Sequence, residues 1–198
     1  MKARILGLMA AALIGAPMAA NAVVIDFDDL VGPVVLTTQY SSFGVNFSAT
    51  EDGSAVGALA GNSLTGAADT APNVWSNCYT TICGGRADIL RIDFASPVSN
   101  LQWYTDTAGS LQPTFNAYDS GDTLVESVIA TATSEGTFAL TSFASSGISY
   151  VELLQPHDSW GYYIDTLSFS SAVPEPATLA LLGVALAGLG FSRRRKLS

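Results

Sequence analysis

Short stretches of alternating apolar and polar residues recur between residues 23 and 172, and they constrain the fold more than any other feature of the chain. In one of them Leu90 and Ile92 fall on one side of an extended chain, and Arg91 and Asp93 fall on the other. Gly, Asn, Asp, Ser and Pro separate the stretches, and no helical period persists for three turns. The pattern predicts an all-β domain of half-buried strands.

The alternation predicts nine strands, and Asp119–Asp122 supplies a turn between two that should pair antiparallel. Residues 52–72 are mostly small or polar, so we expect a long surface loop there with room for one weak strand. Together these features predict a two-sheet sandwich. The predicted strands are Val24–Phe27, Val45–Ser48, Ile89–Phe94, Leu101–Thr105, Thr114–Tyr118, Thr123–Ala130, Gly136–Leu140, Ile148–Leu153 and Tyr162–Phe169.

The N-terminal segment has the pattern of a secretory signal peptide. Lys2 and Arg4 precede the apolar run Ile5–Ala16, and the small-residue site Ala20–Ala22 follows it. We therefore expect residues 1–22 to be removed by cleavage before Val23. The alternative is an uncleaved membrane helix, which Pro17 and the small-x-small site disfavour.

The last 26 residues, 173–198, have the order of an address signal: the motif Val173, Pro174, Glu175, Pro176, then the apolar stretch Ala177–Phe191, then the basic cluster Arg193, Arg194, Arg195, Lys196. A helix over the apolar stretch would span roughly 22 Å, short of a hydrocarbon core of about 30 Å. A single-pass anchor is the alternative. In either case the cations are expected on the cytoplasmic side, with the rest of the chain outside.

This tail resembles the PEP-CTERM sorting signal of exported bacterial proteins. The resemblance implies recognition by an exosortase-type membrane protease, anchoring in the inner membrane through the transmembrane sorting helix, and loss of the tail. It further implies delivery to the cell surface or extracellular matrix and production alongside exopolysaccharide.

The body between the two end segments, residues 23–172, is long enough for one domain with a sizeable core. Its only basic residues are Arg86 and Arg91, against sixteen acidic ones, so its formal net charge is minus fourteen, compared with minus nine for the whole chain. This charge argues against nucleic acid and against electrostatic adhesion to anionic lipid. Bound cations or solubility are the remaining interpretations.

Cys78 and Cys83 are the only cysteines. In an exported chain, a close pair predicts a disulfide rather than a metal site, which would need further His or Cys ligands. A bridge across so short a loop is expected to contribute about 2 kcal/mol and to fix only the local turn.

The body resembles jelly-roll domains in three segments, Val24–Leu30, Gly44–Phe47 and Tyr163–Phe169. The resemblance implies a sandwich of the lectin and carbohydrate-binding-module kind, whose first and last strands lie side by side. By analogy it also implies a structural Ca²⁺ held by carboxylates from both ends of the body. The candidate ligands are Asp26, Asp28, Asp29 and Asp165.

The spacing of these aspartates argues partly against calcium. Alternation places Asp26 and Asp28 on one face and Asp29 on the other, and an Asp after a strand is commonly a turn former. The spacing also differs from the twelve-residue EF-hand loop.

Aromatic residues in loop-like sequence suggest carbohydrate binding, because flat rings can stack on sugars. Trp75 and Trp160 are the candidates, with ordinary packing as the alternative, whereas Trp103 alternates with Leu101 and is expected in the core. Catalysis is not expected, since His157 is the only histidine and no nucleophile motif is present.

The sequence thus predicts an exported, non-catalytic structural protein of the cell surface or matrix, sorted through its tail and associated with exopolysaccharide. A lectin-like carbohydrate-binding module is the alternative. Ice binding is a remote option, because no regular Thr-x-Thr ladder is present. Glycoside hydrolysis is also remote, because a pair of carboxylates is expected by chance among sixteen acidic residues and does not indicate a catalytic pair.

Overall fold

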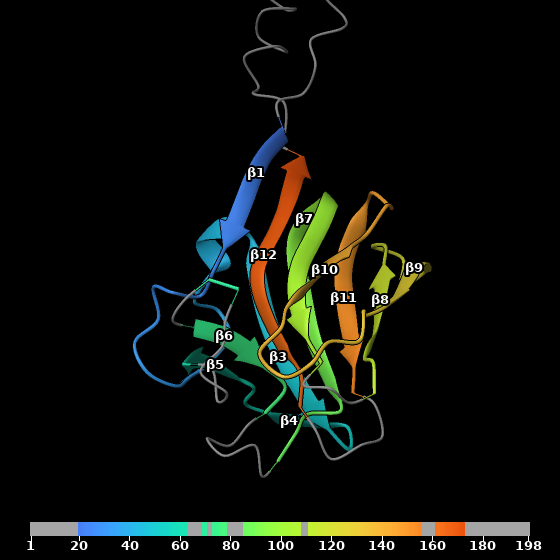
Figure 1. Cartoon of the computed structure of the whole chain (residues 1–198). Helices are drawn as coiled ribbons and strands as arrows, with labels where there is room; N and C mark the ends of the chain where they lie inside the picture. Colours follow the sequence, from blue (N-terminus) through green and yellow to red (C-terminus); the bar gives the residue numbers. More distant parts are fainter. Residues whose placement is uncertain are drawn as a thin grey trace, which may run out of the picture. The chain divides into compact units, whose positions relative to one another are not determined.

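The computed structural model describes residues 20–62, 69–70, 73–78, 85–107, 111–155 and 161–172. Within these residues the chain forms twelve strands, one short 3-10 element and no α-helix (Figure 1). Asn21–Ser171 form a compact unit. The strands are β1 (Ala20–Ile25), β2 (Val34–Val35), β3 (Val45–Glu51), β4 (Ser54–Val56), β5 (Leu59–Asn62), β6 (Asn73–Ser76), β7 (Ile89–Asp106), β8 (Thr114–Tyr118), β9 (Leu124–Ile129), β10 (Ala139–Ser142), β11 (Ile148–Leu154) and β12 (Tyr163–Ala172), and the 3-10 element is η1 (Ser41–Phe43).

The long strand β7 joins two groups of strands, and every pairing whose register is described is antiparallel. Its first half lies between β3 and β11, with β8 and then β9 beyond β11 and β4 beside β3. Its second half lies between β10 and β12, with β6, β5 and β2 following beyond β12. Strand β1 pairs with β12 (Figure 1). The predicted neighbourhood of the first and last strands is therefore confirmed.

The buried side of β7 changes along its length. Ile92 is buried in the first half and Trp103 in the second. The residues that point into the core are therefore even-numbered in the first half of the strand and odd-numbered in the second. Asn100 lies near the change with a φ of 51°, a left-handed conformation that Asn tolerates better than most residues. The sequence predicts separate strands at Ile89–Phe94 and Leu101–Thr105. The structure joins them into one strand that serves both groups.

Aromatic rings from the two strand groups meet in the core. Phe47 of β3 packs edge-to-face on Trp75 of β6, with ring centroids 4.9 Å apart, and Phe115 of β8 packs in the same way on Trp103 of β7 at 5.2 Å. All four side chains are buried. Each such pair adds about 0.5–1.5 kcal/mol beyond the burial of area. This face-to-face packing makes the body a β-sandwich.

The loop prediction for residues 52–72 is wrong in its described part. Strands β4 and β5 lie there, and Ala58 and Ala60 are buried. A Cβ at Gly61 would lie 2.8 Å from the Cα of Pro33, so only a glycine permits this approach of β5 to the segment before β2. The small side chains that allow close packing also remove the alternation from which a strand would be predicted.

Candidate functional site

Several predicted functional residues lie outside the described residues, and their roles stay predictions. They are the sorting motif Val173–Pro176, the basic cluster Arg193–Lys196, Cys83 and Trp160. In the part of the chain that the structure describes, no helix has the length and apolar character needed to cross a membrane. Cys78 is buried and is not a free thiol. Its pairing with Cys83 stays a prediction.

Three aspartates shape the turn that follows β1. The Asp26 carboxylate accepts a hydrogen bond from the backbone N–H of Asp28 at 3.2 Å, and the Asp28 carboxylate accepts one from the backbone N–H of Asn73 at 2.9 Å. The Tyr40 hydroxyl donates to Asp29. Burial, this hydrogen bond and the charges of the three aspartates raise the pKa of Tyr40 well above its ordinary value. The carboxylates therefore tie the turn to β6 and to Tyr40.

Asp165 on β12 binds other partners. Its Oδ2 accepts a hydrogen bond from the backbone N–H of Thr70 at 2.8 Å, and its Oδ1 accepts one from the backbone N–H of Thr166 at 2.6 Å. The residue is fully buried. Burial raises the pKa of this carboxyl to about 6, against the lowering effect of the hydrogen bonds, and the charge of Asp69 adds to the rise.

The structure does not bring the four predicted calcium ligands into one site. Among the described residues, no three His, Cys, Asp or Glu side chains form a group that could hold a metal ion. Ca²⁺ requires six to eight oxygen ligands, whereas protein donors engage the carboxylates of Asp28, Asp29 and Asp165. The described residues therefore present no grouped set of ligands for Ca²⁺, and calcium binding stays a prediction.

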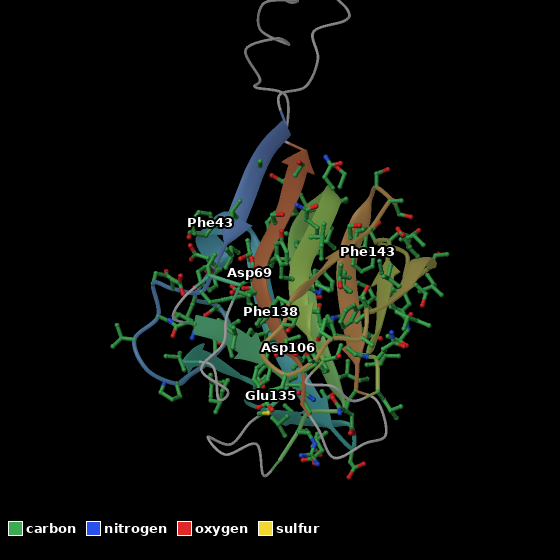
Figure 2. The ribbon with its side chains drawn as sticks, in the orientation of Figure 1. Phe43, Asp69, Asp106, Glu135, Phe138 and Phe143 are labelled. Atoms are coloured by element: carbon green, nitrogen blue, oxygen red, sulfur yellow. The ribbon has the colours of Figure 1, made fainter. Side chains whose placement is uncertain are left out.

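A second buried carboxylate, which the sequence analysis missed, belongs to Asp106 at the end of β7. It accepts hydrogen bonds from the Thr133 hydroxyl at 3.2 Å and from the backbone N–H of Gly136 at 2.8 Å. Glu135 is labelled below Asp106 in Figure 2. Burial, followed by the charges of Asp106 and Glu135, raises the pKa of Tyr163, which pairs with Asp106 across the strands. Asp106 thus anchors a loop to the sheet, as Asp165 does at Thr70.

The prediction that Trp75 presents its ring to a sugar is wrong. Trp75 is fully buried, because its loop-like sequence forms β6, in which all four residues are buried. Its indole packs against Phe47 in the core. Trp103 is fully buried as predicted.

A surface cluster on the first strand group lies where the sequence analysis placed no site. Cross-strand register sets Asp93, Tyr150 and Tyr118 in one row, and the adjacent row holds Arg91, Glu152 and Asn116. The intervening residues Ile92, Val151 and Ala117 are buried, so the two rows share the outward face. We call it the tyrosine–arginine face. Its residues are Arg91, Asp93, Asn116, Tyr118, Tyr150 and Glu152.

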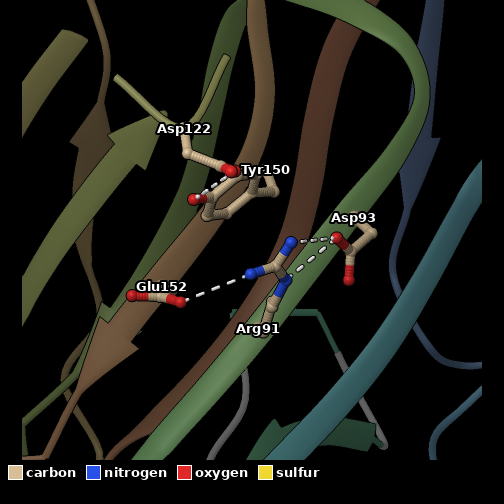
Figure 3. Close-up of polar contacts among 5 residues, drawn as sticks. All are labelled: Arg91, Asp93, Asp122, Tyr150 and Glu152. Atoms are coloured by element: carbon tan, nitrogen blue, oxygen red, sulfur yellow. Dashed lines mark hydrogen bonds and ion pairs between the residues drawn. The ribbon is translucent and has the colours of Figure 1, made fainter. Parts of the chain in front are cut away.

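Polar and ring contacts fix the side chains of this face (Figure 3). Arg91 donates two hydrogen bonds to Asp93, from Nη2 at 2.8 Å and Nε at 2.9 Å, and a longer one from Nη1 to Glu152 at 3.4 Å. Its guanidinium carbon lies 3.7 Å from the ring centroid of Tyr150, a cation–π distance. The Tyr118 and Tyr150 rings stack with centroids 4.7 Å apart. The face is therefore a set of oriented polar groups with half-exposed rings.

Part of this face can be found from the sequence. Alternation puts Arg91 and Asp93 on the outward side of their strand, as the structure confirms with side-chain exposures of 35% and 41%. Tyr118 and Tyr150 are far apart in the chain, however, and their stacking depends on the register between β8 and β11. No local pattern fixes that register.

Comparison with known proteins concerns the tail and the body separately. The PEP-CTERM protein-sorting motif matches residues 172–196. No curated protein matches the chain.

Solved structures match the body at low sequence identity. A cleaved adhesin domain of Lys-gingipain from Porphyromonas gingivalis has a TM-score of 0.50 at 12% identity, covering 78% of this chain and 99% of the domain. A DUF4465 family protein from Bacteroides caccae has a TM-score of 0.46 at 10% identity, covering 76% and 99%. A carbohydrate-binding module of a Cellvibrio mixtus lichenase, in complex with cellotriose, has a TM-score of 0.30 at 10% identity, covering 77% and 98%.

The likeness to the adhesin domain shows the fold of the body alone. The sorting motif implies export and exosortase-mediated sorting to the cell surface. The chain therefore carries a PEP-CTERM protein-sorting motif at its C-terminus, behind an all-β body similar in fold to that adhesin domain.

Proposed function

We propose that this chain is an exported structural protein without catalytic activity, which loses its tail at the cell envelope and remains at the cell surface or in the extracellular matrix with exopolysaccharide. One observation carries the proposal. The sorting motif begins at Ala172, the residue at which β12 ends. Cleavage after this strand would leave the described strands of the body intact. The chain can therefore combine a folded body with a sorting signal that is removed.

The charge distribution supports the order of events. The cluster Arg193–Lys196 holds half of the eight basic residues, while the body has a formal charge of minus fourteen. Before processing, the cluster holds the tail on the cytoplasmic side of the inner membrane. After processing, an acidic body lacks attraction to anionic lipid and leaves the membrane surface.

Fractionation of the native host tests this function, with intact mass measured in each fraction. The chain contains only two lysines, Lys2 and Lys196. The processed chain is therefore expected to lack lysine and to react with amine-directed reagents only at its α-amino group. A Glu175→Ala variant is expected to stay membrane-bound with its tail. A full-length chain resident in the cytoplasm would refute the proposal.

A carbohydrate-binding function is the second candidate, and the tyrosine–arginine face is the observation that favours it. Half-exposed tyrosine rings lie beside fixed carboxylates and an amide, the groups that can contact a sugar ring and its hydroxyls. This candidate rests on Tyr118 and Tyr150 in place of Trp75.

A further inference from the structure

We propose that the tyrosine–arginine face binds a neutral polysaccharide chain laid across the strands. This proposal rests on the carbohydrate-binding candidate above and names its site and ligand class. It concerns the body alone, so it is independent of how the tail is processed.

The charges of the face exclude anionic ligands. Arg91 is its only cation, and two carboxylates, Asp93 and Glu152, already bind it. A third carboxylate, on Asp122, accepts a hydrogen bond from the Tyr150 hydroxyl at 3.1 Å. A phosphate, sulfate or uronate group would meet net negative charge here and would have to displace an existing ion pair. The occupant is therefore uncharged.

The tyrosine–arginine face keeps both hydrogen-bond acceptors and hydrogen-bond donors without partners among the described residues. Within the described residues, Asp93 Oδ2 and Glu152 Oε2 accept no hydrogen bond, and neither the Asn116 amide nitrogen nor the Tyr118 hydroxyl donates one. Two acceptors thus lie beside two donors on neighbouring strands. A hydroxyl group both donates and accepts, so a chain of hydroxyl-bearing rings satisfies all four groups.

The polar rows extend beyond the six residues of the face. On β3, Asn46 lies opposite Asp93 and Ser48 opposite Arg91, and both are exposed. On β9, Ser127 lies opposite Asn116 and donates to its Oδ1 at 2.7 Å. Five strands spaced about 4.8 Å apart give a surface of about 19 Å. This length fits an oligomeric ligand better than a single sugar.

Ring and ion-pair contacts hold the face in place before any ligand arrives. Arg91 covers the Tyr150 ring at 3.7 Å, and the Tyr118 ring stacks on Tyr150. Fixed side chains lose little rotamer freedom on binding, which lowers the entropic cost of the complex. A peptide strand is a poorer occupant, because its backbone pairs with a sheet edge, whereas β11 lies between β7 and β8.

Native affinity electrophoresis of the full chain in a non-ionic detergent tests the proposal. The gels contain hydroxyethylcellulose, galactomannan, dextran or the anionic comparator alginate. We expect retardation in at least one neutral gel and none in alginate. Tyr118→Ala and Asn116→Ala are each expected to weaken retardation at least fivefold, about the effect of one lost hydrogen bond or ring contact. Gln102→Ala, an exposed position on the second half of β7, is the matched control and should change nothing.

Three results would overturn the proposal. They are the absence of retardation in every neutral gel, retardation that both variants retain, and stronger retardation in alginate than in the neutral gels. Sedimentation of the same samples identifies a competing occupant. A dimer that Tyr118→Ala dissociates, without retardation by any polysaccharide, would assign the face to a second copy of the chain. Circular dichroism melting of each variant separates lost binding from lost fold.

Discussion

The buried carboxyl of Asp165 makes stability depend on pH in an unusual direction. Its pKa rises from 3.8 to about 6, chiefly because burial penalises the charged form. Between these two values the native state holds a proton that the unfolded state has released. The stabilisation is therefore fully present below the unfolded pKa and is lost as the pH rises through the native pKa. Most acidic residues with shifted pKa values have the opposite effect.

The magnitude follows from the same shift. The rise in pKa corresponds to about 3 kcal/mol, of which about 2.5 kcal/mol is lost between pH 4 and pH 7. The perturbation is Asp165→Asn, which cannot ionise and keeps one oxygen for the N–H of Thr70 or Thr166. Urea unfolding of both proteins in EDTA, at each pH unit from 4 to 7, gives the difference in unfolding free energy. The other carboxylates titrate in both proteins and cancel in this difference.

We expect the free energy of unfolding of wild type, relative to that of Asp165→Asn, to fall by about 2.5 kcal/mol as the pH rises from 4 to 7. A difference that stays constant or grows would show that the carboxylate ionises as it does in water, and would refute the reasoning. Replacing EDTA by CaCl₂ addresses calcium as well. A calcium ligand at this position would make calcium stabilise wild type and leave the variant unchanged.

Two further predictions concern the core and the disulfide. Phe47→Ala removes a ring that is 4% exposed and is expected to cost about 3–5 kcal/mol of unfolding free energy. Phe43→Ala, at a ring 53% exposed, should cost about 0.5 kcal/mol in the same urea titration; similar costs would contradict the described packing. Cys83→Ser is expected to lower stability by about 2 kcal/mol and to abolish any effect of dithiothreitol. A dithiothreitol effect on stability that persists in this variant would exclude the Cys78–Cys83 pair.

Local alternation predicts the regular strands well and their connections poorly. Thr114–Tyr118 is predicted with the bounds that β8 has, and Ile148–Leu153 falls one residue short of β11. The alternation of apolar and polar residues is a property of each strand alone, so it can be read from the sequence without knowing which strand pairs with it. Strands β5 and β6 escape prediction because one is built of small residues and the other is buried on both sides. Neither alternates.

The acidic residues show the same division between local and long-range information. The sequence indicates a turn former in the aspartates that follow the predicted strand Val24–Phe27, and the hydrogen bond from the Asp28 N–H to Asp26 is local. The partner of Asp28 on β6 and the partner of Asp165 at Thr70 lie 45 and 95 positions away. The sequence therefore shows where a carboxylate charge lies, but it does not show which hydrogen-bond donors the carboxylate binds. Of the four predicted calcium ligands, Asp26, Asp28 and Asp165 already accept hydrogen bonds from backbone N–H groups, and Asp29 accepts one from the Tyr40 hydroxyl.

The same distinction applies to Arg91, one of the two cations of the body. Counting charges makes Arg91 a free positive group on an acidic surface, suited to attract an anion. The structure instead places it between Asp93 and Glu152 and over the Tyr150 ring. Its charge fixes these three neighbours, and two of them, Asp93 and Glu152, each keep one carboxylate oxygen that accepts no hydrogen bond among the described residues. In a highly acidic body, one arginine in this way holds two carboxylates and a tyrosine ring in place, at a point where repulsion between the carboxylates would otherwise disorder them.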